Sequence, residues 1–445
     1  MSDAGAHPSP DLDMEREVVR FCRDLIRIDT TNTGEPEGTV GEALAAEYVE
    51  SVIASAGFDA ERFTTTQGHR QGVVTRIPGR DPQRGALLVH GHLDVVPAKG
   101  SDWSVDPFSA EIRDGMIWGR GAVDMKDMDA MILANLASWG RSGQRPERDL
   151  VVLFTPDEEA GGRNGAHWLV DNRPELFAGV TECVGEVGGF SLTIHDDLRL
   201  YLIQVAEKGL MWLRLRATGA PGHGSMVHDH NAVTTLAESV AAIGRHRFPQ
   251  QMSPSVSGLF EELSKALGRP IDPTDEEQLR SALGPLARIV GATLHDTANP
   301  TMLSAGYKVN VLPESAEAQV DGRYLPGGRQ QFIDQIDALL PPGVTREFIH
   351  DDVALETSFD GPTIAAMSAA LTAEDAGARP VPYMLSGGTD AKAFSRLGIR
   401  AYGFAPLRLP PDLDFASLFH GVDERVPIES LQFGARVLQR FLLTA

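Results

Sequence analysis

The sequence predicts an α/β fold, in which a mixed, largely parallel sheet is flanked by helices and carries an inserted α+β segment. The apolar runs at residues 86–90 and 150–154 are typical of buried strands, and helical spacing lies between them from about Met128 to Trp139. This order of strand, helix and strand indicates parallel strands covered by helices on both faces. Because 445 residues exceed one ordinary core, we expect more than one domain.

Helical periodicity dominates both ends of the chain. Apolar residues recur at helical spacing over residues 18–26 and again over 44–53. Near the C-terminus, residues 364–375 and 428–443 are predicted helices, and the apolar run 399–404 is a predicted strand between them. The two ends therefore share one pattern and are expected to form one α/β domain.

The middle of the chain has a different pattern. Residues 209–217 and 316–320 alternate apolar and polar side chains, which is typical of strands solvated on one face. Helical segments are expected near 231–245 and 275–290. The expected domains are residues 1–204 together with 351–445, and an inserted α+β domain at residues 205–350.

Composition excludes several classes of partner. The formal net charge of −22 repels phosphates, so we expect neither nucleic acid nor a membrane surface as a partner. The two cysteines, Cys22 and Cys183, are far apart in the sequence, which argues against a disulfide framework or a cysteine zinc site. The N-terminus lacks a basic region followed by an apolar stretch, and no run approaches the ~20 apolar residues of a membrane span. We expect a cytoplasmic protein.

Residues that can bind metal follow the predicted strands. His92 and Asp94 come directly after the first buried run, and Asp157, Glu158 and Glu159 follow the second. In parallel sheets the functional residues lie just past the carboxyl ends of the strands. Asp94 can accept the second ring proton of His92 and so fix its tautomer.

Two further residues complete a candidate set of ligands. Asp124 lies in a glycine-containing segment that permits tight turns around an ion, and His420 supplies a second imidazole. Glu158 and Glu159 cannot point the same way on an extended segment, so one can bind metal while the other faces water. Each residue alone has an ordinary structural explanation. Together, in this order and at strand ends, they predict a hydrolytic dinuclear metal site.

Short segments with these residues recur in a fixed order along the chain. They are His90–Pro97, Gly119–Lys126, Thr155–Gly161, Gly222–Ser225, Asn310–Pro313, Ser386–Asp390 and Phe419–His420. These segments resemble the motifs of the dinuclear zinc exopeptidase family that includes aminoacylase-1, succinyl-diaminopimelate desuccinylase, bacterial glutamate carboxypeptidase and carnosinase-type dipeptidases. The resemblance covers about residues 20–440.

The resemblance implies roles for individual residues. One zinc ion is expected at His92, Asp124 and Glu186, and the other at Asp124, Glu159 and His420. Asp124 would then bridge two Zn²⁺ ions per subunit, although such ligands also accept Co²⁺ or Mn²⁺. Glu158 would act first as general base and then as general acid.

The inserted domain resembles the lid and dimerisation domain of that family. His223 is expected to reach the active site of the partner in a homodimer and to stabilise the oxyanion. Asn310, Arg323 and the loop Gly387, Gly388 and Thr389 resemble the groups that hold the substrate carboxylate, a task that suits the planar fork of arginine. The alternative for Arg323 is a surface charge on a lid strand.

The chain also departs from the family pattern. Asp127 stands where glycine is common and adds a negative charge near the bridging position, and Val227 stands where proline is common. The segment 250–299 is longer than a minimal lid needs, and it could extend the dimer contact or narrow the pocket entrance.

The expected function is that of a zinc-dependent amidohydrolase. It would cleave an amide bond next to a free carboxylate in a small peptide or N-acyl amino acid, as a carboxypeptidase, dipeptidase or deacylase. An N-carbamoyl-amino-acid hydrolase with similar ligands is an alternative. A catalytically inactive, metal-free dimeric binding protein is the alternative from another class.

Overall fold

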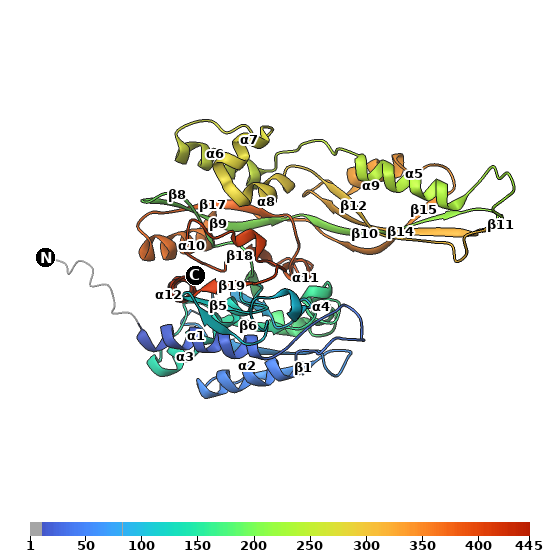
Figure 1. Ribbon diagram of the computed structural model, residues 1–445. Coiled ribbons are helices and arrows are strands. Elements are labelled where there is room, and N and C mark those ends of the chain that lie inside the picture. Colours follow the sequence, from blue (N-terminus) through green and yellow to red (C-terminus); the bar gives the residue numbers. More distant parts are fainter. Residues whose placement is uncertain (1–10, 82) are drawn as a thin grey trace. The chain divides into compact units, whose positions relative to one another are not determined.

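The computed structural model describes residues 11–81 and 83–445, which form two compact units (Figure 1). The first unit comprises the described residues of 1–204, 359–381 and 389–445, and the second comprises 205–358 and 382–388. Residues 1–10, whose sequence lacks a basic region followed by an apolar stretch, lie outside the described residues. No helix of the described chain combines the length and the apolar character needed to cross a membrane.

The first unit is an α/β layer structure. Its helices are α1 (Leu12–Arg27), α2 (Ala43–Ser55), α3 (Lys126–Ser142), α4 (Ala166–Asn172), α10 (Gly361–Glu374), α11 (Ala391–Ser395) and α12 (Ile428–Thr444). Its main strands are β1 (Glu61–Thr64), β2 (Gln71–Ile77), β3 (Ala86–His92), β6 (Leu150–Thr155), β7 (Val180–Gly185), β8 (Ser191–His195) and β18 (Arg400–Gly403). Small strands β4 (Glu111–Arg113), β5 (Met116–Trp118) and β19 (Arg425–Pro427) pair separately. The chain passes between the units within β9 (Leu198–Glu207) and within β17 (Ala378–Leu385).

The main sheet is mixed, with a parallel centre. Its strands run in the order β1, β2, β6, β3, β7, β18 and β9, and β8 also pairs with β9. The central strands β6, β3, β7 and β18 are parallel, whereas β1, β2 and β9 are antiparallel to their neighbours. The predicted fold class is therefore confirmed.

Helices cover both faces of this sheet. Every residue of β3 and β6 is buried, as expected for parallel strands between two helical layers. Successive residues of a strand point to opposite faces. On β3, His90 contacts Phe394 of α11, and Gly91 lies against Asp129 of α3. On the α3 side, α1 and α12 pack with α3.

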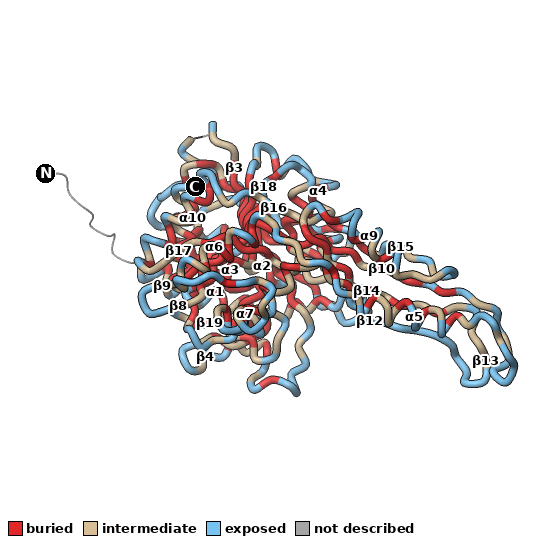
Figure 2. The backbone as a smooth tube through the Cα atoms, turned by 90° about the horizontal axis from the view of Figure 1, so that it is seen from above, coloured by how far each residue is buried: buried red, intermediate tan, exposed pale blue. Residues whose placement is uncertain are grey.

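The second unit is built on an antiparallel sheet in the order β12 (Thr297–Ala305), β14 (Ser315–Tyr324), β10 (Gly209–Thr218) and β15 (Val344–Asp352). Burial alternates along β14, which confirms a strand with one solvated face. Helices α5 (Ala232–Arg245) and α9 (Arg329–Ala338) supply Leu236, Phe332 and Ile336 to the core on the other face. The remaining elements are α6 (Pro254–Leu267), α7 (Glu276–Leu283), α8 (Ala287–Ala292), β11 (Gly222–His223), β13 (Val311–Leu312) and β16 (Leu355–Glu356). Figure 2 shows mostly exposed positions around β13.

Two sequence expectations about elements are corrected. The single helix expected near 275–290 is two helices, α7 and α8, because Gly284 at φ +54 and Pro285 break it. The strand expected to end at His90 continues to His92, so His92 is the last residue of β3.

Gly91 is a position where the sheet leaves no room for a side chain. A Cβ atom built there would lie 2.1 Å from Asp129 Oδ1. We expect Gly91→Ala to lower the free energy of unfolding by ~1–3 kcal/mol, because the core must shift to accept a methyl group. Urea denaturation measures this. The control is Gly68→Ala, where a Cβ meets nothing within 4 Å, and the change there should stay within ~0.5 kcal/mol. Equal effects of the two substitutions would contradict the packing argument.

Candidate metal centre

The candidate ligands meet at the carboxyl ends of neighbouring parallel strands. His92 ends β3, Glu158 and Glu159 follow β6, and Glu186 directly follows β7. Since β6, β3 and β7 are adjacent and parallel, their carboxyl ends lie at one edge of the sheet. The fold therefore brings together side chains that are far apart in the sequence.

Two groups of potential ligands occur among the described residues. One contains His92, Asp124 and Glu186, and the other contains Asp124, Glu159 and His420; within each group the ligand atoms lie within 4.8 Å of one another. His92 Nε2 is 3.1 Å from Asp124 Oδ1 and 3.4 Å from Glu186 Oε2. His420 Nε2 is 3.1 Å from Asp124 Oδ2 and 3.0 Å from Glu159 Oε2. Asp124 thus offers one oxygen to each group.

The site concentrates more carboxylates than its histidines can neutralise. The pKa of Glu186 is raised to about 8, mainly by burial and also by the charges of Asp124 and Glu159, against the opposing effect of His92. Burial, followed by the charge of Glu186, raises the pKa of Glu158 well above its usual range. Glu159 Oε1 is buried and has no hydrogen-bond partner among the described residues. Imidazole nitrogens and carboxylate oxygens are the ligands of Zn²⁺ and similar cations, so this arrangement fits two divalent ions.

Glu158 and Glu159 diverge because they lie on a tight turn. They form a short 3₁₀ turn at Glu158–Ala160, not the extended segment that the sequence analysis assumed. Asp157 at φ +72 and Gly161 at φ +91 bound this turn. Glu159 points toward His420, whereas Glu158 Oε2 lies 3.9 Å from His92 Nε2 and belongs to neither ligand group. The turn therefore leaves Glu158 beside the ligands with its carboxylate unused.

Asp94 contacts His92 in a different way from the one expected. His92 Nδ1 is 3.0 Å from the Asp94 carbonyl oxygen and 3.7 Å from its carboxylate. The carboxylate instead accepts the backbone N–H groups of Glu158 and Glu159, both at 3.1 Å. Asp94 therefore orients the imidazole through its backbone and holds the acidic turn through its side chain.

Glu424 is a buried residue of the site that the sequence analysis did not identify. One carboxylate oxygen accepts the N–H groups of Val123 (2.7 Å) and Asp124 (3.3 Å). The other accepts the N–H of Gly121 (3.1 Å) and the guanidinium of Arg120 (2.6 Å). A carboxylate that accepts several backbone N–H groups holds a loop firmly. Glu424 stands four residues after His420, but a single glutamate on a turn carries no signal in the sequence.

Asp127, which the sequence suggested as an added negative charge near Asp124, lies in the protein interior. Burial raises the pKa of its carboxyl to about 8, and the charges of Glu424 and Asp124 act in the same direction.

The residues expected to contact substrate belong to the second unit or its boundary. His223 is exposed on β11, which pairs with β13, and its Nδ1 accepts a hydrogen bond from the backbone N–H of Ser225 (3.2 Å). Asn310 lies next to it, since its carbonyl accepts the N–H of Gly224 at 2.9 Å. The fork of Arg323 is engaged by Asp321, with Nε at 2.8 Å and Nη2 at 3.3 Å.

The loop after β17 contains the remaining candidates. Gly387 and Gly388 are half-buried, and Thr389 is buried with its hydroxyl oxygen accepting the N–H of Ala391 at 3.2 Å. Their roles toward substrate stay predictions.

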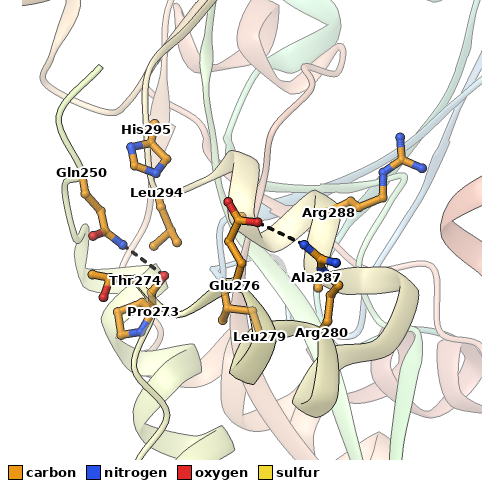
Figure 3. A pocket seen from close by; sticks show the side chains of 11 residues that line it. Gln250, Pro273, Thr274, Glu276, Leu279, Arg280, Ala287, Arg288, Leu294 and His295 are labelled. Atoms are coloured by element: carbon orange, nitrogen blue, oxygen red, sulfur yellow. Dashed lines mark hydrogen bonds and ion pairs between the residues drawn. The ribbon is translucent and has the colours of Figure 1, made fainter. Parts of the chain in front are cut away.

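The segment 250–299, whose role the sequence left open, forms a pocket of about 530 Å³ within the second unit (Figure 3). Two pairs of its lining residues contact each other. Arg280 Nη2 is 3.1 Å from Glu276 Oε2, and Gln250 Nε2 donates to the Pro273 carbonyl at 3.3 Å.

Comparison with known proteins identifies the family. Residues 88–444 match the peptidase family M20/M25/M40. The chain belongs to this family. It is 28% identical to aminoacylase-1 of Sus scrofa over 95% of this chain and 91% of that protein. It is 27% identical to the N-fatty-acyl-amino acid synthase/hydrolase PM20D1 of Xenopus tropicalis over 94% of this chain and 83% of that protein.

A solved structure supports the same fold. The M20 family metallo-carboxypeptidase Sso-CP2 of Sulfolobus solfataricus superimposes with a TM-score of 0.73 at 19% identity, covering 96% of this chain and 99% of that one. The resemblance drawn from the sequence is confirmed, and the protein is a hydrolase of the peptidase and aminoacylase type.

The shared position of Asp124 leads to a test of metal binding. We expect Asp124→Ala to lose more bound metal than Asp94→Ala, because Asp124 faces both ligand groups whereas Asp94 acts through His92 and the acidic turn. Loss of an outer partner typically weakens metal affinity by ~10–100-fold. Elemental analysis of the two purified variants measures this. Full and equal occupancy in both would contradict the bridging arrangement.

Proposed function

We propose that this protein is a dinuclear, zinc-dependent amidohydrolase that cleaves an amide bond next to a free carboxylate. Its substrates are small peptides or N-acyl amino acids. The single observation that supports this most is the carboxylate of Asp124, which offers one oxygen to each ligand group beside the unused carboxylate of Glu158. Imidazoles and carboxylates around two positions, with a spare carboxylate nearby, are the requirements of metal-assisted hydrolysis.

The ligand sets follow from the two groups of side chains. His92 and Glu186 would hold one ion, Glu159 and His420 the other, and Asp124 both. When bound, two such cations lower the pKa of a water molecule toward ~7 and polarise a carbonyl. Co²⁺ or Mn²⁺ could replace zinc at such ligands.

Glu158 is the proposed proton carrier. Its carboxylate takes a proton from the attacking water and then gives it to the leaving nitrogen, so that the amine departs neutral. The turn at Glu158–Ala160 supports this role, because it separates Glu158 from the ligand Glu159. Asp94 keeps the turn in place through its bonds to both backbone N–H groups.

Substrate selection is proposed to depend on a free carboxylate. Aminoacylase-1 and a metallo-carboxypeptidase are similar to this chain, and the substrates that their names imply share that group. Asn310, Arg323 and the Gly387, Gly388 and Thr389 loop are the candidates to bind it. Since Asp321 engages the fork of Arg323, a substrate carboxylate would take the place of Asp321.

We also propose a homodimer formed through the second unit. Strands β12 and β15 lie at the edges of its sheet, and an edge strand can pair with a strand of another copy. Large apolar side chains are exposed on β12 and near the paired strands β11 and β13, namely Met226, Val227, Met302, Leu303, Tyr307 and Val309. Exposed apolar surface of this kind is typical of a protein contact. In such a dimer, His223 would serve the active site of the partner.

An N-carbamoyl-amino-acid hydrolase remains the alternative reaction, since it needs similar ligands. The inactive binding protein is disfavoured, because the candidate ligands and Glu158 are all present. The cytoplasmic location stays a prediction.

A substrate panel tests the function. We expect the wild-type protein with zinc or cobalt to cleave N-acyl amino acids or dipeptides. Glu158→Gln should keep its metals but lose at least ~10²–10⁴-fold in turnover, because an amide cannot accept the proton. Initial rates and elemental analysis measure both effects. Glu159→Gln is the matched control, and it should lose metal. Near-normal turnover in Glu158→Gln would show that Glu158 is not the general base.

The same panel includes N-carbamoyl amino acids and the C-terminal amide of each substrate. Preferential cleavage of the carbamoyl compounds would select the alternative reaction. Amides hydrolysed as readily as free acids would contradict recognition of the carboxylate.

The homodimer leads to a complementation test. Co-expressed His223→Ala and Glu158→Gln chains should recover activity that neither homodimer has, because a heterodimer contains one site with both residues intact. Tandem affinity tags isolate the heterodimer for rate measurements. Demonstrated heterodimers without recovered activity would show that His223 does not serve the partner's site.

A further inference from the structure

Asp157 is the member of the acidic run that neither ligand group uses. Its side chain is 3% exposed and turns away from the candidate ligands. One carboxylate oxygen accepts the N–H of Asn164 at 2.7 Å, and the other lies 3.1 Å from Arg70 Nη2 and 3.3 Å from Asn32 Nδ2. The start of the acidic turn is therefore attached to a buried polar cluster of Asn32, Arg70 and Asp157.

Arg70 lies at the centre of this cluster. It directly precedes β2, and its side chain is 4% exposed. Nη1 donates to Glu42 Oε1 at 2.5 Å, and Nη2 donates to Asn32 Oδ1 at 2.7 Å. The guanidinium is thus the cation that faces the buried carboxylates of Glu42 and Asp157.

Arg70 and the backbone N–H of Gly34, which donates to Asn32 Oδ1 at 3.0 Å, together favour one orientation of the Asn32 amide. A guanidinium has only donors, whereas an asparagine amide has an oxygen that accepts and a nitrogen that donates. With Oδ1 turned to Arg70, the amide nitrogen must point the other way, where it donates to Asp94 Oδ2 at 2.8 Å. The reversed amide would place donor against donor at Arg70 and acceptor against acceptor at Asp94.

Asp94 links the Asn32 amide to the candidate metal centre. Its carboxylate accepts from the Asn32 amide and from the N–H groups of Glu158 and Glu159, and its carbonyl contacts His92 Nδ1. Backbone bonds attach the same segments, since Asn32 N donates to the Val95 carbonyl at 2.9 Å. A displacement of the Asn32 amide would therefore move Asp94, and through Asp94 it would move His92, Glu159 and Glu158.

We propose that Arg70 is a positioning residue of the metal centre, which acts by fixing the Asn32 amide and thereby Asp94 and the Glu158–Glu159 turn. This inference rests on the proposed function, because it assumes that the two ligand groups bind metal. Arg70 itself touches neither ligand group, so its effect is indirect.

The test compares Arg70→Gln with Arg70→Lys in the full-length protein. Glutamine removes the charge and the guanidinium donors that hold Asn32, Glu42 and Asp157 together, whereas lysine keeps the charge and has only donors. We expect Arg70→Gln to bind zinc ~10–100-fold more weakly in chelator competition, as for other outer partners of metal ligands. Its kcat should fall with little change in KM, and the visible spectrum of the cobalt form should change. Arg70→Lys should restore part of the affinity.

Matched variants separate this effect from general loss of stability. Arg148 is also a buried arginine of the first unit and pairs with Glu182 at 2.6 Å before β6, at the other end of the strands from the ligands. Arg148→Gln should lower the melting temperature but leave zinc affinity within ~3-fold, because Arg148 contacts no group that holds a ligand.

A second pair of variants tests the proposal if Arg70→Gln does not fold. Asn32→Asp keeps the shape of the side chain but turns a carboxylate toward Asp94, and it should weaken zinc binding to a similar extent. Its control is Asn135→Asp, since Asn135 is a buried asparagine that donates to backbone carbonyls of Met131 and Ala435.

Two results would overturn the positioning role. One is wild-type zinc affinity in a folded Arg70→Gln or Asn32→Asp protein. The other is an equal loss of affinity in Arg148→Gln or Asn135→Asp. If the wild-type protein binds no divalent metal at all, the proposed metal centre itself fails and this inference fails with it.

Discussion

The carboxylate of Asp124, shared between His92 and His420, is the interaction on which the site depends. Its two oxygens each lie 3.1 Å from a different imidazole, so one side chain fixes the spacing of both ligand groups. A single misplaced loop would therefore disturb both groups at once. This explains why buried hydrogen bonds surround the loop that carries Asp124, above all those that Glu424 accepts.

The site gathers negative charge where water is largely excluded, which is unfavourable unless positive groups compensate. The protein supplies part of that compensation from outside the ligand groups. Arg120 faces Glu424, Arg70 faces Asp157 and Glu42, and backbone N–H groups of tight turns point at Asp94. These groups do not compensate the negative charge of the candidate ligands themselves. Bound cations would compensate it.

The two units differ in how their candidate functional residues are surrounded. In the first unit, the candidate ligands and Glu158 lie next to one another, and Asp94 bonds to the turn that carries Glu158. In the second unit, His223 and Asn310 are exposed at the paired strands β11 and β13, and Asp321 engages the fork of Arg323. A substrate or a second copy of the chain would change the surroundings of these residues.

The sequence determined the α/β class and the strands β3 and β6 with helix α3 between them, because local periodicity and strand ends are encoded over a few residues. It also indicated His92, Asp124 and His420 as candidate ligands, but it left open which of Glu158 and Glu159 binds metal, and only the family resemblance assigned Glu159. Glu186 could be assigned only through resemblance, since the short strand β7 before it went unrecognised. Only the tertiary structure showed the contacts of Glu424, Asp94 and Arg70. Arg70 meets Asn32 and Asp157 across 38 and 87 positions of the chain, and no local pattern records such a contact. Hydrogen-bond direction in a buried cluster depends on which donors and acceptors the fold places together, and that is fixed only when the strands have assembled.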